Sequence, residues 1–90
     1  MAEIVKRVEF ATVLNDGIQL KDVQWTVKLD DRIVGHIHLT EEARFKVKLY
    51  KQNGETKWLS SSEYTPLVPF DTFVEARARI QKMALAEYQQ

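Results

Sequence analysis

Two histidines that stand two positions apart are the first residues in this sequence whose types could support chemistry. On a β-strand, His36 and His38 would project from the same face at roughly 7 Å, close enough to share a metal ion with Glu41 or Glu42. Zinc sites, however, usually use three or four protein ligands, and the chain has no third histidine and no cysteine. We therefore expect no metal site, and interpret the pair as solvated side chains near Lys28 that can respond to pH.

A basic segment follows the histidines. Residues 44–57 hold five basic side chains against one acid, Glu55. Lysine and arginine neutralise phosphates, and exposed aromatic rings stack on bases, in proteins that bind nucleic acid on a sheet surface. The same pattern is typical of a solvated or aggregation-protected strand, or of a docking site for an acidic protein. The candidate binding residues are Lys28, His36, His38, Arg44, Lys46, Lys48, Tyr50, Lys51 and Lys57.

The sequence gives little support for catalysis. Gly17, Gly35 and Gly54 stand alone, so there is no glycine-rich phosphate loop, and the serines at 60–62 do not lie in a nucleophile-elbow motif. A chain of 90 residues also offers little volume for an enclosed site. We expect a protein that is not an enzyme and that uses no cofactor.

Composition limits the partners and the compartment. Thirteen Lys+Arg balance thirteen Asp+Glu, so no long-range field attracts nucleic acid or anionic lipid, and any such binding must come from a local patch. The absence of cysteine fits a reducing compartment, and no apolar run resembles a signal peptide or a membrane span. We expect a soluble cytoplasmic protein with one domain, residues 1–90, built from a sheet at 3–60, a loop at 61–70 and a helix at 72–88.

Alternating apolar residues predict antiparallel strands in the first two thirds of the chain. Residues 3–14 lead into Asn-Asp-Gly at 15–17, a strong hairpin signal, and residues 18–29 continue as a second strand with a phase slip near Asp22. Residues 43–51 alternate most cleanly. Their inward side chains would be Phe45, Val47 and Leu49.

Side-chain parity predicts how the second and third strands pair. A three-residue loop sets Leu29 opposite Ile33 and Val27 opposite Gly35, so that the apolar side chains share one face, whereas a two-residue loop mixes the faces. The glycine would give the neighbouring Trp25 indole room, or would mark a bulge.

A further turn signal, Asn53-Gly54, favours a two-residue type I′ turn. That turn would place Leu49 opposite Trp58, so Trp58 is expected on the core face. The better candidates for contact with a partner are Tyr50, Tyr64 and Tyr88.

A helix is predicted after an extended loop at 60–69, which holds three serines and both prolines. Thr72 and Glu75 match a capping box, so the helix would run from about 73 to 88. The main apolar stripe would consist of Phe73, Ala76, Ile80, Met83 and Ala84. A narrower outer stripe, left partly exposed, would consist of Val74, Ala78 and Leu85.

These elements predict an α+β fold. A small antiparallel sheet of four to five short strands would be followed by one C-terminal amphipathic helix packed on one face. The other face of the sheet would be left toward solvent.

The segment PFDTFVEARARI, about a dozen residues at the start of the predicted helix, resembles the same region of plant AP2-type and integrase arm-type DNA-binding domains. The resemblance implies a sheet that reads DNA with basic strand residues. Those families carry several arginines in a strongly basic sheet, whereas this chain has one arginine in its basic strand and no net charge. We do not assign the chain to either family.

The leading functional hypothesis is a non-catalytic interaction module, an accessory, adaptor or inhibitor protein. It would bind a macromolecular partner, a protein in preference to nucleic acid, through the exposed sheet face or the outer helix stripe. One alternative is nucleic-acid binding through residues 44–57. The other is a structural homo-oligomer, such as a homodimer, joined through an uncovered strand edge.

Overall fold

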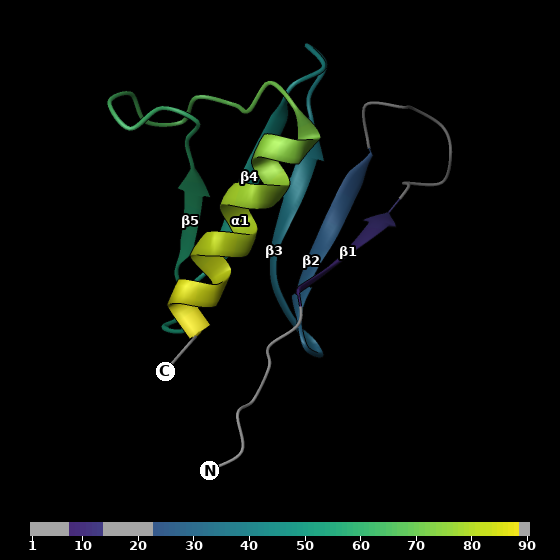
Figure 1. Cartoon of the computed structure of the whole chain (residues 1–90), viewed down its shortest axis with the longest axis vertical. Helices are drawn as coiled ribbons and strands as arrows, with labels where there is room; N and C mark the ends of the chain where they lie inside the picture. The colour runs from purple at the N-terminus through teal and green to yellow at the C-terminus, as the bar shows by residue number, and fades with distance from the viewer. Residues whose placement is uncertain (1–7, 14–22, 89–90) are drawn as a thin grey trace.

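The computed structural model describes residues 8–13 and 23–88. Five strands form one antiparallel sheet in sequence order, and a helix crosses one of its faces (Figure 1). The elements are β1 (Val8–Val13), β2 (Gln24–Leu29), β3 (Arg32–Leu39), β4 (Phe45–Tyr50), β5 (Thr56–Leu59) and α1 (Phe73–Tyr88). The predicted α+β fold is therefore confirmed. The predicted turn at 15–17 and the phase slip near Asp22 lie outside the described residues.

The pairing of β2 with β3 is only partly as predicted. Trp25 lies opposite Ile37, in agreement with the prediction, but the pairing shifts by one residue near the turn. Leu29 does not lie opposite Ile33, because the turn has two residues instead of three. The shift makes Val34 the extra residue of a β-bulge, so Val34 is buried while Ile33 turns to the other face and is 49% exposed.

The helix begins where the capping residues predict. The Thr72 hydroxyl accepts a hydrogen bond of 3.2 Å from the Glu75 backbone N–H, which satisfies one of the free donors of the first turn. One row of side chains, four residues apart, faces the sheet and is buried: Ala76, Ile80, Ala84 and Tyr88. Tyr88 was expected at the surface, but its hydroxyl donates to the backbone carbonyl of Tyr50. Within the described residues, no helix is long and apolar enough to cross a membrane.

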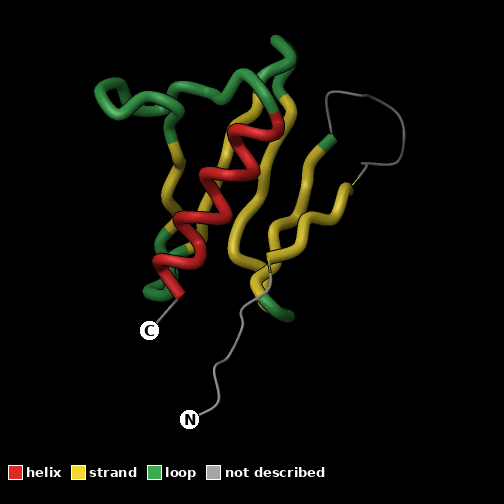
Figure 2. The backbone as a smooth tube through the Cα atoms, in the orientation of Figure 1, coloured by secondary structure: helices red, strands yellow, loops and turns green. Residues whose placement is uncertain are grey.

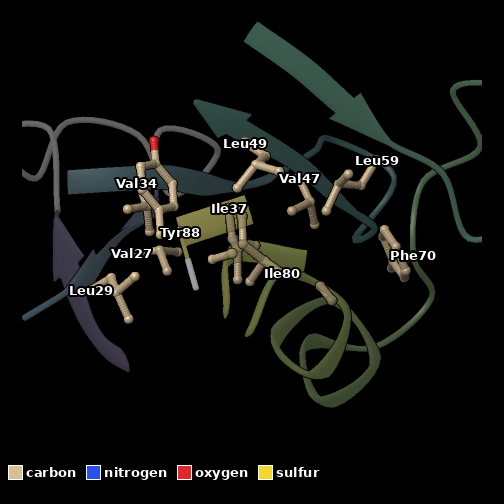
Figure 3. Packing of buried hydrophobic residues seen from close by; sticks show 12 residues of the cluster. Val27, Leu29, Val34, Ile37, Val47, Leu49, Leu59, Phe70, Ile80 and Tyr88 are labelled. Carbon is tan, nitrogen blue, oxygen red and sulfur yellow. The ribbon is translucent and has the colours of Figure 1, made fainter. Parts of the chain in front are cut away.

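Gly35 lets the helix approach the sheet closely. It lies opposite Val27, as predicted, but it does not serve to make room for Trp25, which packs on the rings of Phe45 and Phe73 with centroid distances of 5.9 and 4.6 Å. A Cβ added at Gly35 would lie 2.7 Å from Cδ1 of Ile80 and would collide with the backbone carbonyl of the adjacent strand. Figure 3 shows Ile80 beside Ile37, near the centre of the buried apolar cluster.

The helix thus covers one face and leaves the other uncovered. α1 packs mainly on β4 and β3, and the tube in Figure 2 shows β1 and β2 lying to one side of it. The buried cluster lies between α1 and the sheet. The opposite sheet face, called the open face below, points away from the viewer in Figure 1.

The variant Gly35→Ala tests this close approach. In an ordinary strand the change would stabilise by about 0.4–1 kcal/mol through the unfolded chain, whereas overpacking against Ile80 costs about 1–3 kcal/mol. We expect net destabilisation, measured as a lower midpoint of urea unfolding. Val74→Ala, at a helix position that is 74% exposed, is the control and should change the stability by less than about 0.5 kcal/mol. A Gly35→Ala midpoint equal to that of the unmodified protein would contradict the packing.

Candidate binding site on the open sheet face

The turn between β4 and β5 decides which way Trp58 points. The loop after Lys51 has three residues, closed by a 3.0 Å hydrogen bond from the Gly54 N–H to the Lys51 carbonyl, and Gly54 has a φ of 90°. This is the three-residue hairpin with a glycine bulge rather than the predicted two-residue turn. One extra loop residue reverses the parity of the strand. Trp58 therefore lies opposite Lys48 instead of Leu49, and it is 44% exposed.

The open face carries the side chains that alternate with the buried ones. On the part of β3, β4 and β5 beyond the bulge, these side chains are His36, His38, Lys46, Lys48, Tyr50, Thr56 and Trp58. None of them is acidic. Lys28 of β2 also lies on this face, directly opposite Glu9 of β1.

Aromatic rings surround one lysine on this face. The Lys48 ammonium lies 5.4 Å from the ring centroid of Trp58 and 5.5 Å from that of Tyr50. His36 links to Tyr50 through a 2.8 Å hydrogen bond between Nδ1 and the hydroxyl, and His38 lies with its ring centroid 6.3 Å from that of Trp58. The two imidazole centroids are 6.0 Å apart. We call these five residues the Lys48 cluster.

Burial and nearby lysines favour the neutral form of the two imidazoles. Burial, and then the charge of Lys48, lower the pKa of His36 below its ordinary value of 6.5. The pKa of His38 is lowered by burial, by Lys48, by His36 and by Lys46. Nε2 of His38 is enclosed and has no hydrogen-bond partner, so a proton there would stay unsatisfied. At neutral pH the positive charge of the cluster therefore comes from its lysine.

The structure divides the predicted basic segment. Lys46 and Lys48 share the open face, but Lys57 lies opposite Leu49 and so belongs to the helix side of the sheet. Lys51 also belongs to the helix side, because it is the next residue after Tyr50 and successive side chains of a strand point to opposite faces. Its backbone N–H continues the pairing by donating to the Glu55 carbonyl at 2.8 Å. The predicted set 44–57 is thus not one surface.

Arg44 stands at the rim of the sheet. Its Nε lies 3.7 Å from a carboxylate oxygen of Asp71, and both side chains are mostly exposed. Its charge is therefore partly offset by the Asp71 carboxylate. Within the described residues, no three metal-ligating side chains gather into a possible metal site.

A shallow groove of about 150 Å³ adjoins Trp58. The lining residues include Lys46, Trp58, Leu67 and Pro69. The far wall belongs to the loop at 60–69, which the serines hold together: the Ser60 hydroxyl accepts from the backbone N–H of Val68 at 3.1 Å. Sequence reasoning treated this loop as simply extended and missed its internal hydrogen bonds, although serine-rich stretches can close turns in this way.

The outer helix stripe is narrower than predicted. Val74 and Ala78 are exposed, but Leu85 packs against the core cluster. Of the tyrosines expected to make contacts, Tyr64 is 93% exposed in the loop at 60–69. These positions are scattered, whereas the Lys48 cluster is contiguous.

The lowered histidine pKa values predict a pH-dependent stability. Because the unfolded chain takes up these protons at higher pH than the folded protein, the stability contributed by the neutral imidazoles is present above about pH 6.5 and is lost as the pH falls below it. The charged or titratable groups facing the imidazoles are Lys46, Lys48 and Tyr50; Gln24 and Thr26 face them from β2. Proton NMR should give both histidines a pKa below 6.5.

The variant Lys48→Ala should raise both of these pKa values, since it removes a repelling charge. Lys82→Ala, at an exposed position on α1, removes one positive charge from the helix side of the sheet and should leave both histidine pKa values unchanged. Histidines that titrate at or above 6.5 in the unmodified protein would show that the imidazoles are not enclosed as described.

Comparisons with known proteins leave the function to be inferred from this geometry. Searches against protein-family models, curated proteins and solved structures found no match to this chain.

Proposed function

We propose that the protein is a non-catalytic binding module, an accessory, adaptor or inhibitor protein, that contacts a macromolecule through its open sheet face. The observation that carries this proposal is the exposed Trp58 beside Lys48, in a contiguous aromatic and cationic surface that the helix does not cover. Tryptophan and tyrosine, the two aromatic residues beside Lys48, are enriched in binding hot spots.

The cost of exposing Trp58 supports the same conclusion. Burying a large apolar side chain contributes about 1.5–3 kcal/mol, and a small chain has few such side chains for its core. A two-residue turn between β4 and β5 would have placed Trp58 on the helix side of the sheet, but the three-residue turn places it on the exposed face. A binding role accounts for an aromatic surface that stability alone does not require.

The open face offers little for catalysis. The imidazoles of the Lys48 cluster lie on a sheet surface and contact rings and a tyrosine hydroxyl. General acid–base chemistry instead relies on a concave site that excludes water and holds a substrate against the proton donor. Binding is therefore the function that this arrangement supports best.

Site-specific photo-cross-linking in cells of the source organism tests the proposal without assuming the partner. A photoreactive amino acid at Thr56, on the open face beside Tyr50, should form cross-links to a macromolecule. The same amino acid at Val74, on the exposed side of α1, is the matched control and should form few. We expect Lys48→Glu to reduce the Thr56 cross-links by roughly tenfold, since a hot-spot change costs about 1–2 kcal/mol or more.

Cross-links that form only from Val74, or that survive Lys48→Glu without change, would contradict the proposed surface. Each variant should first be shown to unfold at the same urea concentration as the unmodified protein, because the substituted side chains lie outside the core.

A further inference from the structure

We propose that the Lys48 cluster binds single-stranded nucleic acid, with a backbone phosphate at Lys48 and unpaired bases stacked on Trp58 and Tyr50. This inference rests on the proposed use of the open face and names the ligand of that face.

The order of groups across the cluster matches the order of groups in a nucleic-acid strand. Trp58 lies opposite Lys48, and Tyr50 lies two residues along β4 on the same face, so the two rings stand on diagonal positions roughly 7–8 Å apart. The Lys48 ammonium lies between them, 5.4 Å from one ring centroid and 5.5 Å from the other. A phosphodiester likewise joins two nucleotides, with a base on either side of the phosphate. The Lys48 ammonium can therefore bind a phosphate while the Trp58 and Tyr50 rings stack on the bases on either side of it.

The cluster can open to such a ligand at little cost. In the free protein, Lys48 covers both rings through cation–π contacts, which are weak at exposed sites. A phosphate draws the ammonium away through a charge-assisted hydrogen bond. The ring faces released in this way then become available for stacking.

Charge complementarity also favours a polyanion. Lys46 stands next to Lys48 on β4, and none of the open-face side chains on β3, β4 or β5 beyond the bulge is acidic. Because the whole chain carries no net charge, binding depends on this local patch rather than on a long-range field. We expect an affinity in the range of sequence-independent binders, with Kd values of roughly 1–100 μM at physiological salt.

The composition of the face separates this ligand from two others. The centres of protein interfaces are depleted in charged residues such as lysine, whereas Lys46 and Lys48 stand beside the rings of the open face. Duplex bases are already stacked and paired, so protruding rings on a sheet engage unpaired bases instead. The groove beside Trp58, with Lys46 and Leu67 in its lining, extends the surface around the indole toward the loop at 60–69.

Fluorescence polarisation with labelled oligonucleotides of about twelve nucleotides tests the inference on the whole 90-residue chain. Single-stranded oligo(dT) and oligo(U) should bind at least tenfold more tightly than a duplex of equal length. Trp58→Ala should weaken binding roughly 5- to 150-fold, the loss of one stacked base, while Trp58→Phe retains most of the affinity. Trp58 lies outside the core cluster, and both variants should unfold at the same urea concentration as the unmodified protein.

The lysines are tested through salt dependence. Lys46→Ala with Lys48→Ala should lower the slope of log Kd against log salt by about 1.4, the contribution of two phosphate contacts on a single strand. Lys57→Ala with Lys82→Ala removes the same charge from exposed positions on the helix side, and should leave the affinity within about twofold and the slope within about 0.3.

Three results would overturn the inference. The first is equal affinity for duplex and single strand. The second is an equal loss in the two double-lysine variants. The third is binding of polyglutamate as tight as that of oligo(dT) and equally weakened by Trp58→Ala, which indicates an acidic protein as the ligand. If no oligonucleotide binds but the Thr56 cross-links persist, the ligand class is wrong and the open face still stands as the binding surface.

Discussion

The pairing of Lys48 with Trp58 decides the character of the open face, because it sets which way every side chain of β5 points. Strand alternation has a period of two, so one additional residue in the preceding loop moves the whole strand from one face to the other. Gly54, with a φ of 90°, supplies the conformation that this longer loop needs. Lys57 and Leu59 then belong to the helix side, and Trp58 joins the rings around Lys48. The turn therefore determines the surface on which the proposed function depends.

A second constraint fixes which face remains open. The main apolar row of the helix comes closest to the sheet backbone at Gly35, which has no side chain and leaves room for Ile80. The bulge at Val34 acts together with it, since two consecutive residues of β3, Val34 and Gly35, are buried there. On β3, β4 and β5 beyond the bulge, the opposite face is left to polar, cationic and aromatic side chains. Core packing and the candidate site are thus two sides of the same sheet.

Much of the architecture could be predicted from local patterns. The clean alternation of residues 43–51, the Thr72 cap and the buried row of α1 all follow from short-range chemistry that the sequence states directly. The tail of the helix was harder, because Tyr88 has the amphipathic character of a surface residue and only the tertiary contact with Tyr50 shows that it is buried.

The two errors in pairing share one physical cause. Asn-Gly is compatible with a two-residue turn and with a three-residue turn, since both place glycine at positive φ. In the three-residue turn of this protein, the Asn53 side chain accepts a hydrogen bond of 2.9 Å from the Glu55 N–H. Ile33 and Val34 are likewise both β-branched and apolar, so composition does not tell which of them the bulge buries. Local residue preferences are compatible with either turn length and either register. The packing of the complete sheet determines which one forms. As a result, the sequence alone placed Trp58 in the core and missed the most informative residue of the candidate site.

Nuclear Overhauser effects from the Trp58 indole protons test the central claim most directly, because they report which side chains lie within a few ångströms of the ring. The described pairing predicts contacts from the indole to the side-chain methylenes of Lys48 and to the imidazole of His38. Indole contacts to Leu49 and Ile80 in their place would put Trp58 beneath the helix, and would contradict both the open aromatic face and the binding role inferred from it.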